Sequence, residues 1–161
     1  MTHTLDNYDR ILLAALQDNA QCTQGELGEL ANLSTAAVNR RLKLLRQAGV
    51  IERTTACVNP KAVGYPLTIV VEVSVESERA DLLDALQQRF QACPQVQQCY
   101  YVAGECDFVL IFLVREMDQY VALTRSLFLD NPNVKTFKTL VVMNRLKTGL
   151  GVPIDAPAGQ V

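Results

Sequence analysis

The sequence predicts an α+β chain with an N-terminal winged helix-turn-helix domain and a C-terminal ferredoxin-like domain of βαββαβ order. Three observations support this prediction. Apolar residues between positions 5 and 48 recur three and four apart, which is typical of amphipathic helices. From position 67 onward apolar and polar residues alternate, which is typical of half-buried strands. Pro60, Gly64 and Pro66 interrupt the chain between the two patterns.

These changes of pattern divide the chain into four expected segments. They are a helix-turn-helix domain at residues 1–60, a linker at 61–66, a ferredoxin-like domain at 67–150 and a C-terminal tail at 151–161. A chain of 161 residues accommodates one compact domain or two small ones, because domains commonly contain roughly 100–200 residues. The length therefore excludes a large multidomain enzyme.

Composition excludes several classes of function. The longest nearly apolar run, residues 108–114, is far shorter than the ~20 residues that cross a bilayer. The N-terminus lacks the basic-then-apolar pattern of a signal peptide, so we expect a cytoplasmic protein without membrane contact. Five cysteines without a Cys-x-x-Cys pair and one histidine, His3, argue against disulfides, zinc and histidine-based catalysis. We expect mostly buried thiols, no cofactor, no metal and no enzymatic activity.

Two helices are expected before residue 32. The first covers residues 5–19. Thr23 and Glu26 have the spacing of a capping box, in which a hydroxyl and a carboxylate each accept a backbone N–H bond at a helix start. The second helix therefore begins at this pair, and Asn32-Leu33-Ser34 interrupts it.

A third helix is expected from Thr35 to about Ala48. Ser34 is a suitable N-cap, and Gly49 is the expected left-handed residue after the last turn. The following segment, Val50–Val58, mixes β-branched and polar residues and is predicted to form a short two-stranded wing.

The third helix is half apolar and half cationic. The chain has a net charge of −2, yet the stretch from Arg40 to Arg46 holds four cations and no acid. At 100° per residue most of these cations lie opposite the apolar side of the helix. Arg41 falls nearer the apolar side, so we assign it to packing or to an intramolecular ion pair. A local basic stripe of this kind is sufficient to contact phosphates.

After the linker the predicted order is strand, helix, strand, strand, helix, strand. The expected ranges are 67–75, 79–92, 96–102, 108–114, 117–129 and 134–144, with a hairpin loop at 103–107 between the second and third strands. This order is that of a ferredoxin-like unit, whose helices cover one face of the sheet. The uncovered face of such apolar strands requires a partner, and self-association is the simplest solution.

A capped three-helix unit with a basic third helix, followed by a ferredoxin-like unit with a Gly-x-x-Asp hairpin, resembles the Lrp/AsnC family of prokaryotic transcription regulators. The similarity covers about residues 5–150 in the family's order and spacing. The matching residues are Leu5-Asp6, Asp9, Ile11-Leu12, Glu26-Leu27, Leu33-Ser34, Arg41, Leu45, Gly49-Val50-Ile51, Asn59-Pro60, Gly64, Gly104, Asp107, Val141-Val142-Met143 and Lys147.

The resemblance implies a regulator whose helix-turn-helix binds operator half-sites in double-stranded DNA. It also implies that the C-terminal domain, named RAM for regulation of amino-acid metabolism, forms a homodimer and binds a small effector such as an amino acid. Members of the family commonly assemble further into tetramers or octamers.

On this interpretation the third helix enters the major groove with its N-terminal part toward the bases. The expected base contacts come from Thr35, Ala36, Asn39 and Arg40, because Asn pairs well with adenine and Arg with guanine. The expected phosphate contacts come from Lys43, Arg46 and Arg53, with a hydroxyl bond from Ser34.

By resemblance, the loop from Gly104 to Asp107 is the effector-binding hairpin. Its carboxylate is expected to hold an α-amino group while nearby N–H groups hold a carboxylate. Glu105 stands where the family usually has aspartate. The resemblance also implies that a neighbouring wall of the effector site is lined by Met117, Thr136 and Leu140.

Alternatives remain open at this stage. Gly104 and Asp107 are also the residues that a tight hairpin turn needs, whatever its function. Cys106 in the same loop is a candidate redox-sensing thiol. The whole chain could instead be a nucleoid-type architectural protein that binds DNA without a ligand, or a metabolic sensor that acts on an enzyme through its C-terminal domain alone.

Overall fold

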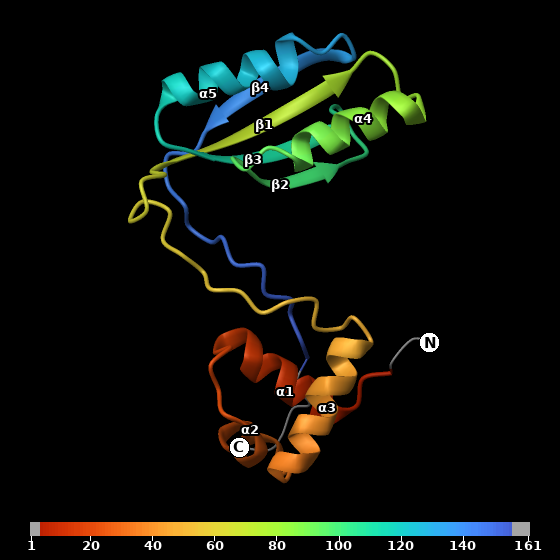
Figure 1. Ribbon diagram of the computed structural model, residues 1–161, viewed down its shortest axis with the longest axis vertical. Coiled ribbons are helices and arrows are strands. Elements are labelled where there is room, and N and C mark those ends of the chain that lie inside the picture. Colours follow the sequence, from red (N-terminus) through yellow and green to blue (C-terminus); the bar gives the residue numbers. More distant parts are fainter. Residues whose placement is uncertain (1–3, 156–161) are drawn as a thin grey trace. The chain divides into compact units, whose positions relative to one another are not determined.

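The computed structural model describes residues 4–155, which form two units (Figure 1). One unit contains the residues up to Ala56 together with those from Thr148 onward, and the other is Cys57–Lys147. His3 and the last part of the expected tail, residues 156–161, lie outside the described residues. None of the helices in the described part of the chain is long and apolar enough to cross a membrane.

The first unit is built from three helices, α1 (Asn7–Asp18), α2 (Gln24–Ala31) and α3 (Thr35–Gln47). Each helix buries one apolar stripe against the other two, as the spacing of apolar residues predicts. The buried core consists of Leu12, Leu13, Leu27, Ala31, Val38, Leu42 and Leu45.

Helices α2 and α3 begin where the sequence predicts. The Thr23 hydroxyl accepts the Glu26 N–H at 3.2 Å, and the Glu26 carboxylate accepts the Thr23 N–H at 2.7 Å. Ser34 caps α3 by accepting the Ala37 N–H at 3.3 Å. Gly49 has a φ of 72°, the left-handed conformation expected after α3. The predicted helix-turn-helix is therefore confirmed.

The C-terminal segment of the first unit packs on its helices. The Gln17 side chain of α1 donates to the Val152 carbonyl at 2.9 Å and accepts the Val152 N–H at 2.6 Å. Ile154 is partly buried against the helical core. Residues 151–154 thus contribute to this unit, although their sequence has little pattern.

The predicted two-stranded wing at Val50–Val58 is wrong, because this segment contains no strand. Only Ile51 packs against the helical core, and residues 52–58 are exposed. The segment contains no Gly, Asn, Asp or Pro at which two strands could turn tightly. An isolated two-stranded hairpin is in any case only marginally stable in water.

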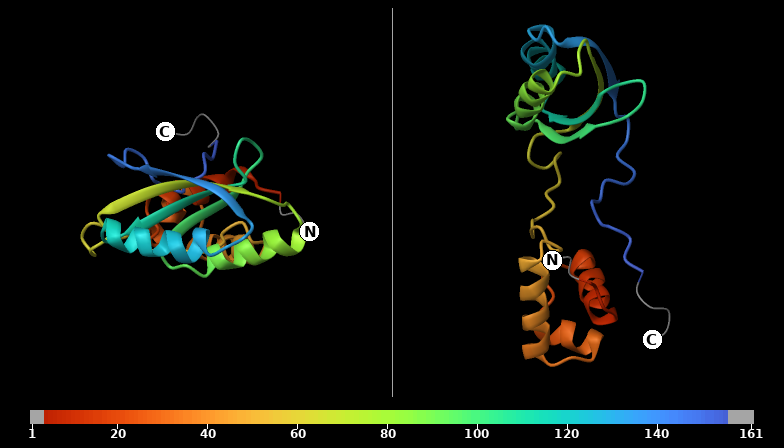
Figure 2. Two further views of the ribbon diagram at one scale, coloured as in Figure 1. Left: turned by 90° about the horizontal axis from the view of Figure 1, so that it is seen from above. Right: turned by 90° about the vertical axis from the view of Figure 1, so that its right-hand side faces the viewer.

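The second unit contains a four-stranded antiparallel sheet in the order β2-β3-β1-β4. Its helices α4 and α5 lie on the same face of the sheet (Figure 2). The elements are β1 (Leu67–Val75), α4 (Ala80–Gln91), β2 (Val96–Tyr101), β3 (Phe108–Val114), α5 (Met117–Thr124), η1 (Arg125–Leu129) and β4 (Val134–Val141). The ferredoxin-like prediction is confirmed, with two differences: the second helix ends in a π-helical turn, η1, and β4 ends at Val141.

The central strand β3 shows how the two faces of the sheet differ. Phe108, Leu110, Phe112 and Val114 are buried on the helical side. Val109, Ile111 and Leu113 alternate with them and remain only half buried. The side of the sheet away from the helices therefore carries an apolar stripe along β3 that residues 4–155 leave uncovered, beside the Glu72–Lys138 ion pair of β1 and β4.

Candidate DNA-binding and effector sites

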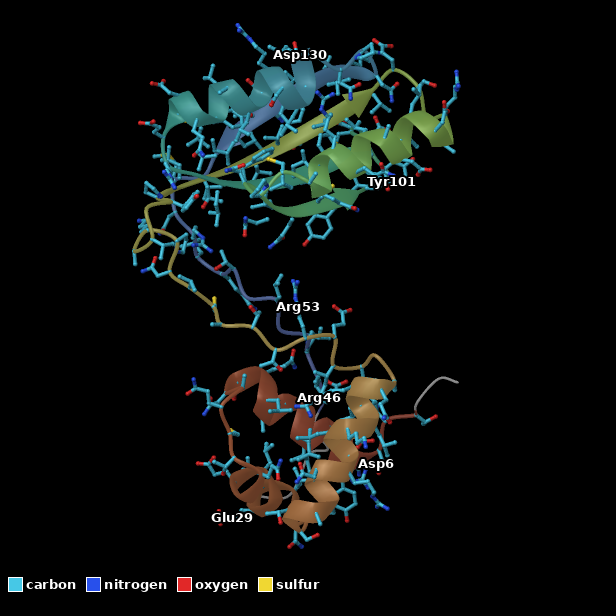
Figure 3. All side chains as sticks on the ribbon, in the orientation of Figure 1. Asp6, Glu29, Arg46, Arg53, Tyr101 and Asp130 are labelled. Carbon is cyan, nitrogen blue, oxygen red and sulfur yellow. The ribbon has the colours of Figure 1, made fainter. Side chains whose placement is uncertain are left out.

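The N-cap Ser34, the exposed face of α3 and the segment after it contain all the predicted DNA-contacting side chains. Within residues 4–155 the cations among them form no ion pair with another side chain. Figure 3 marks Arg46 on α3 and Arg53 in the following segment. The exposed residues are Ser34, Thr35, Ala36, Asn39, Arg40, Lys43, Arg46 and Arg53.

The N-termini of α2 and α3 differ electrostatically. The first turn of α2 contains Glu26, and the backbone N–H and the hydroxyl of Thr23 hold the pKa of Glu26 below its ordinary value. The first turn of α3 contains no acid. A helix N-terminus attracts anions through its free N–H groups and the helix dipole. The α3 terminus therefore remains suited to a phosphate, whereas a carboxylate already occupies the α2 terminus.

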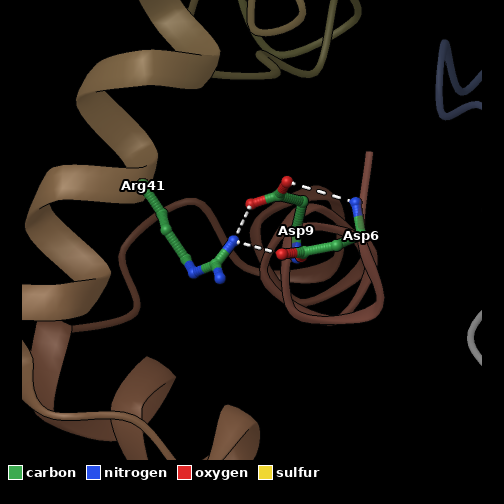
Figure 4. Close-up of polar contacts among 3 residues, drawn as sticks. All are labelled: Asp6, Asp9 and Arg41. Atoms are coloured by element: carbon green, nitrogen blue, oxygen red, sulfur yellow. Dashed lines mark hydrogen bonds and ion pairs between the residues drawn. The ribbon is translucent and has the colours of Figure 1, made fainter. Parts of the chain in front are cut away.

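Arg41 is directed inward and pairs with α1 (Figure 4). Its guanidinium lies 2.8 Å from a carboxylate oxygen of Asp6 and 2.8 Å from one of Asp9, and 5.1 Å from the ring centre of Tyr8. The side chain of Asp9 is only 3% exposed, and its ion pair with Arg41 offsets part of the cost of burying a carboxylate. The assignment of Arg41 to an intramolecular ion pair is confirmed.

The pKa values of Asp6 and Arg41 follow from their contacts. Burial opposes ionisation of Asp6, but bonds from the Asp9 N–H and from Arg41 outweigh it and lower the pKa of Asp6. Burial likewise opposes the charge of Arg41, and the bonds to Asp9 and Asp6 raise its pKa nonetheless. The cluster joins α3 to α1 and sets the orientation of the α3 surface.

Asn39 is paired with a residue that the sequence did not single out. The Gln24 amide donates to Asn39 Oδ1, and the Asn39 amide donates back to Gln24 Oε1. Gln24 is the first residue of α2, so the pair crosses from one helix of the helix-turn-helix to the other. Both side chains remain exposed.

The predicted effector loop lies between β2 and β3, and Asp107 anchors it to β1. The Asp107 N–H donates to the Val73 carbonyl at 2.9 Å, and its carboxylate accepts the Val75 N–H at 2.7 Å. The pairing of β1 with β3 ends at Val73 and Phe108, so the Val75 N–H lies beyond the last pair and the Asp107 carboxylate satisfies it. The described contacts of Asp107 therefore stabilise the loop itself.

The tip of the loop is open. Gly104 does not have a positive φ, and a side chain at this position would meet no described atom within 4 Å. No conformational requirement of the folded chain explains this glycine. Glu105 is exposed, and its carboxylate has no partner within residues 4–155. The available acid of the loop is thus Glu105 rather than Asp107.

The three expected wall residues do not converge on this loop. Thr136 lies opposite Ser74, at the same end of the sheet as Asp107. Leu140 lies opposite Val70, four residues further along β4. Met117 begins α5, shortly after β3 has ended beside Leu67 at the other end of β1. One chain therefore brings only part of the expected effector site together.

A cavity of about 340 Å³ lies beside Thr136, lined by Phe128, Leu129 and Val134–Phe137. A second, of about 410 Å³, lies on α5 between Asp118 and Arg125.

Within the described residues no three His, Cys, Asp or Glu side chains are grouped to hold a metal. Only Cys93 is buried, so the prediction of mostly buried thiols is wrong.

Comparison with known proteins assigns each of the two units to a domain family. Residues 5–52 match the model of a winged helix-turn-helix DNA-binding domain, and residues 68–152 match that of the Lrp/AsnC ligand-binding domain. The chain belongs to the Lrp/AsnC family. It is therefore a DNA-binding transcription regulator with a ligand-binding domain, as the resemblance implied.

Relatives agree with this membership along nearly the whole chain. An uncharacterised HTH-type transcriptional regulator of Sinorhizobium fredii is 45% identical, covering 94% of this chain and 89% of that protein. The leucine-responsive regulatory protein of Haemophilus influenzae is 31% identical, covering 89% and 86%. A Neisseria meningitidis transcriptional regulator solved as a complex with L-Met has 27% identity and a TM-score of 0.88, covering 94% and 98%.

Sequence reasoning about this Lrp/AsnC chain missed two glutamines. Gln24 and Gln17 each form a reciprocal amide contact with a distant part of the chain. An exposed glutamine has no short-range pattern, so its partner is visible only in the fold. The position of Gln24, directly after the N-cap of α2, was the one available hint.

Proposed function

We propose that this Lrp/AsnC protein binds operator DNA as a dimer through α3, and that an amino acid bound near the β2–β3 loop changes this binding. The observation that supports it best is the exposed face of α3, whose cations Arg40, Lys43 and Arg46 form no ion pair within residues 4–155. Cations free of ion pairs along a helix whose first turn holds no acid form a surface that duplex phosphates can contact.

The side chains along α3 have different tasks in this proposal. Thr35, Ala36, Asn39 and Arg40 lie in its N-terminal half and contact bases in the major groove. The phosphate contacts fall to Lys43, Arg46 and Arg53, which come later in the chain, and to the hydroxyl of Ser34. Arg41 is excluded from DNA contact because two carboxylates hold it.

The uncovered face of the sheet is the proposed dimer interface. Val70, Ile111 and Leu140 are among the apolar side chains on this face. Joining two chains there gives two α3 helices, which bind half-sites about 34–36 Å apart along the duplex. Ile111→Lys should sediment as a monomer, whereas the variant Gln88→Lys, at an exposed position of α4, should remain a dimer. A dimeric Ile111→Lys variant would exclude this interface.

The proposed effector is a free amino acid. Glu105 offers a carboxylate to its ammonium group, and backbone N–H groups of the loop approach its carboxylate because Gly104 has no side chain. The Asp107 carboxylate holds the loop against β1 by accepting the Val75 N–H. The L-Met complex of the Neisseria relative supports this chemical class. We also propose that the protein has no enzymatic activity and that it acts in the cytoplasm, where a regulator contacts DNA.

Selection from a randomised duplex library tests the DNA-binding part. The wild-type chain should enrich a pseudo-palindrome, and Asn39→Ala or Arg40→Ala should relax one base position per half-site. A thermal-shift screen of the twenty amino acids tests the effector, since a ligand of the native state raises the melting temperature. Enrichment of no sequence, with binding that grows only with duplex length, would instead support an architectural protein.

A further inference from the structure

The helices α4 and α5 cover the same face of the sheet, but their outward sides differ (Figure 2). The large apolar side chains of α4 are all buried or half-buried. On α5 and the η1 turn that follows it, Val121 is 61% exposed and Leu129 is 67% exposed. Single exposed apolar residues are common on protein surfaces, so the residues around Val121 decide what this side of α5 can bind.

Four exposed residues of different character share the outward side of α5. Asp118, Val121, Ala122 and Arg125 together line the hollow of about 410 Å³. At 100° per residue their positions fall within about 100° of the helix circumference. Buried Tyr120 lies on the other side, in the core between helix and sheet. The outward side thus presents an acid, an apolar pair and a base, in that order along the chain.

The two charges of this side have no partner on their own helix. Asp118 and Arg125 form no ion pair within residues 4–155. Charges on one helix pair when they are three or four residues apart. These two lie about two turns apart, or ~10 Å at 1.5 Å per residue. On α4, in contrast, Asp81 is paired with Arg79 at 2.8 Å.

The order of these four residues is complementary to itself. When a second copy of α5 packs antiparallel, a twofold axis midway between Asp118 and Arg125 passes between Val121 and Ala122. Asp118 of each copy then faces Arg125 of the other, and Val121 faces Ala122. The small alanine leaves room in the hollow for the larger valine, so the apolar centre fills as the charges pair. A twofold contact between identical chains requires this kind of self-complementary surface.

We propose that the outward side of α5 is a second interface between copies of this chain, and that it joins sheet-linked dimers into larger assemblies. This inference rests on the dimer of the proposed function. One α5 contact is small and exposed ion pairs are weak, so it does not hold two single chains together. A sheet-linked dimer presents two α5 surfaces, and a closed assembly that engages both gains from their high effective concentration. Each particle then carries at least four α3 helices.

The two charges also suit the dipole of α5, and this effect predicts a different result from the interface. Asp118 lies in the first turn of α5 and Arg125 directly follows its last residue, an arrangement that stabilises a helix by itself. If only the dipole matters, exchanging the two charges weakens the helix and restores nothing. At the interface, the exchange brings opposite charges together again, because each position faces the other.

Sedimentation equilibrium of the full-length protein tests this interface by charge exchange. The wild-type chain should form particles larger than a dimer. Asp118→Arg and Arg125→Asp should each stop at the dimer, with association of dimers weakened at least about tenfold, because like charges meet twice in every contact. An equal mixture of these two variants should regain the wild-type mass. The variant that carries both substitutions should regain it as well.

Asp84→Arg and Arg89→Asp are the matched controls on α4. Both residues are exposed and form no ion pair within residues 4–155, so these variants should keep the wild-type mass. A wild-type chain that sediments only as a dimer would overturn the inference. Single α5 variants of wild-type mass, or a mixture and a double variant that remain dimers, would overturn it too.

The sheet interface of the proposed function is tested separately by Ile111→Lys, whose position lies on the opposite face of the sheet. If Ile111→Lys remains a dimer, the sheet interface fails, whatever the α5 variants do. A monomeric Ile111→Lys variant together with α5 variants of wild-type mass refutes only the inference about α5.

Discussion

The exposed face of α3 and the β2–β3 loop carry the two candidate sites, and the fold treats their charged side chains differently. On α3, Arg40, Lys43 and Arg46 are exposed, and none forms an ion pair within the described chain. In the loop, the carboxylate of Asp107 accepts the Val75 N–H. The helix presents its charges to a partner, whereas the loop uses one of its two acids to hold its own shape.

This contrast follows from backbone chemistry. A helix satisfies its own backbone bonds, so the side chains on its outer face are left available. A loop that follows the end of a strand pairing leaves a backbone donor that some side chain must accept. A charged side chain in a loop can therefore serve the loop's own backbone and not a ligand, as Asp107 does.

The largest expected effect separates the adjacent arginines of α3. Arg41→Ala should lower the free energy of unfolding by about 2–3 kcal/mol, because the buried carboxylate of Asp9 loses the guanidinium 2.8 Å away. Arg40→Ala should change it by less than about 0.5 kcal/mol, because Arg40 is exposed and unpaired within residues 4–155. Urea unfolding of both variants measures the difference. Equal losses would contradict the division of α3 into a paired and a free side.

A similar comparison distinguishes the two acids of the loop. Asp107→Ala should cost about 1–3 kcal/mol of stability, because it leaves the Val75 N–H without its acceptor. Glu105→Gln should leave stability unchanged but weaken binding of the amino acid found by thermal shift. Calorimetric titration of the folded variants measures that binding. Unchanged binding by Glu105→Gln would remove Glu105 from the effector site.

A smaller effect is expected from the phosphate-contacting side of α3. Lys43→Ala should weaken binding about equally for all DNA sequences and reduce the slope of log affinity against log salt by about one unit. Fluorescence anisotropy at several salt concentrations measures this slope. A change in base preference without a change in slope would place Lys43 among the base contacts.

The smallest expected effect is a loss of folding stability at acidic pH. The pKa of Asp6 is lowered from its ordinary 3.8, so its ionised form is favoured by folding. Its contribution to stability is complete above that ordinary value and disappears as pH falls through the lowered one. Thermal melts followed by circular dichroism should show the helical unit losing stability in this range. Asp6→Asn should flatten the dependence, and an unchanged profile would argue against the role of Asp6.

The sequence predicted most of the fold because the deciding signals are short-range. The Thr23 and Glu26 capping box, the Ser34 cap and Gly49 are defined by a few neighbouring residues, and each is where it was expected. The alternation in β3 likewise predicted which of its residues are buried. The wing at Val50–Val58 was wrong because β-branched composition alone does not provide a turn.

The candidate sites were predictable only in part. Exposure of the α3 residues follows from helical periodicity, which the sequence contains. Strand register decides that the Asp107 carboxylate accepts the Val75 N–H. It also decides how far Met117 lies from Thr136 along the sheet. Register is set by the packing of whole strands rather than by any local motif.

By itself, the amino-acid sequence determined where helices and strands begin, which sides they bury, and that α3 presents cations without acids. Those properties arise from residues close together in the chain. Only the tertiary structure decided that Gln24 holds Asn39, that Gln17 holds Val152 and that Arg41 joins α3 to α1. These contacts join residues 15 to 135 positions apart, and such side-chain hydrogen bonds depend on the folded backbone to bring both partners within reach.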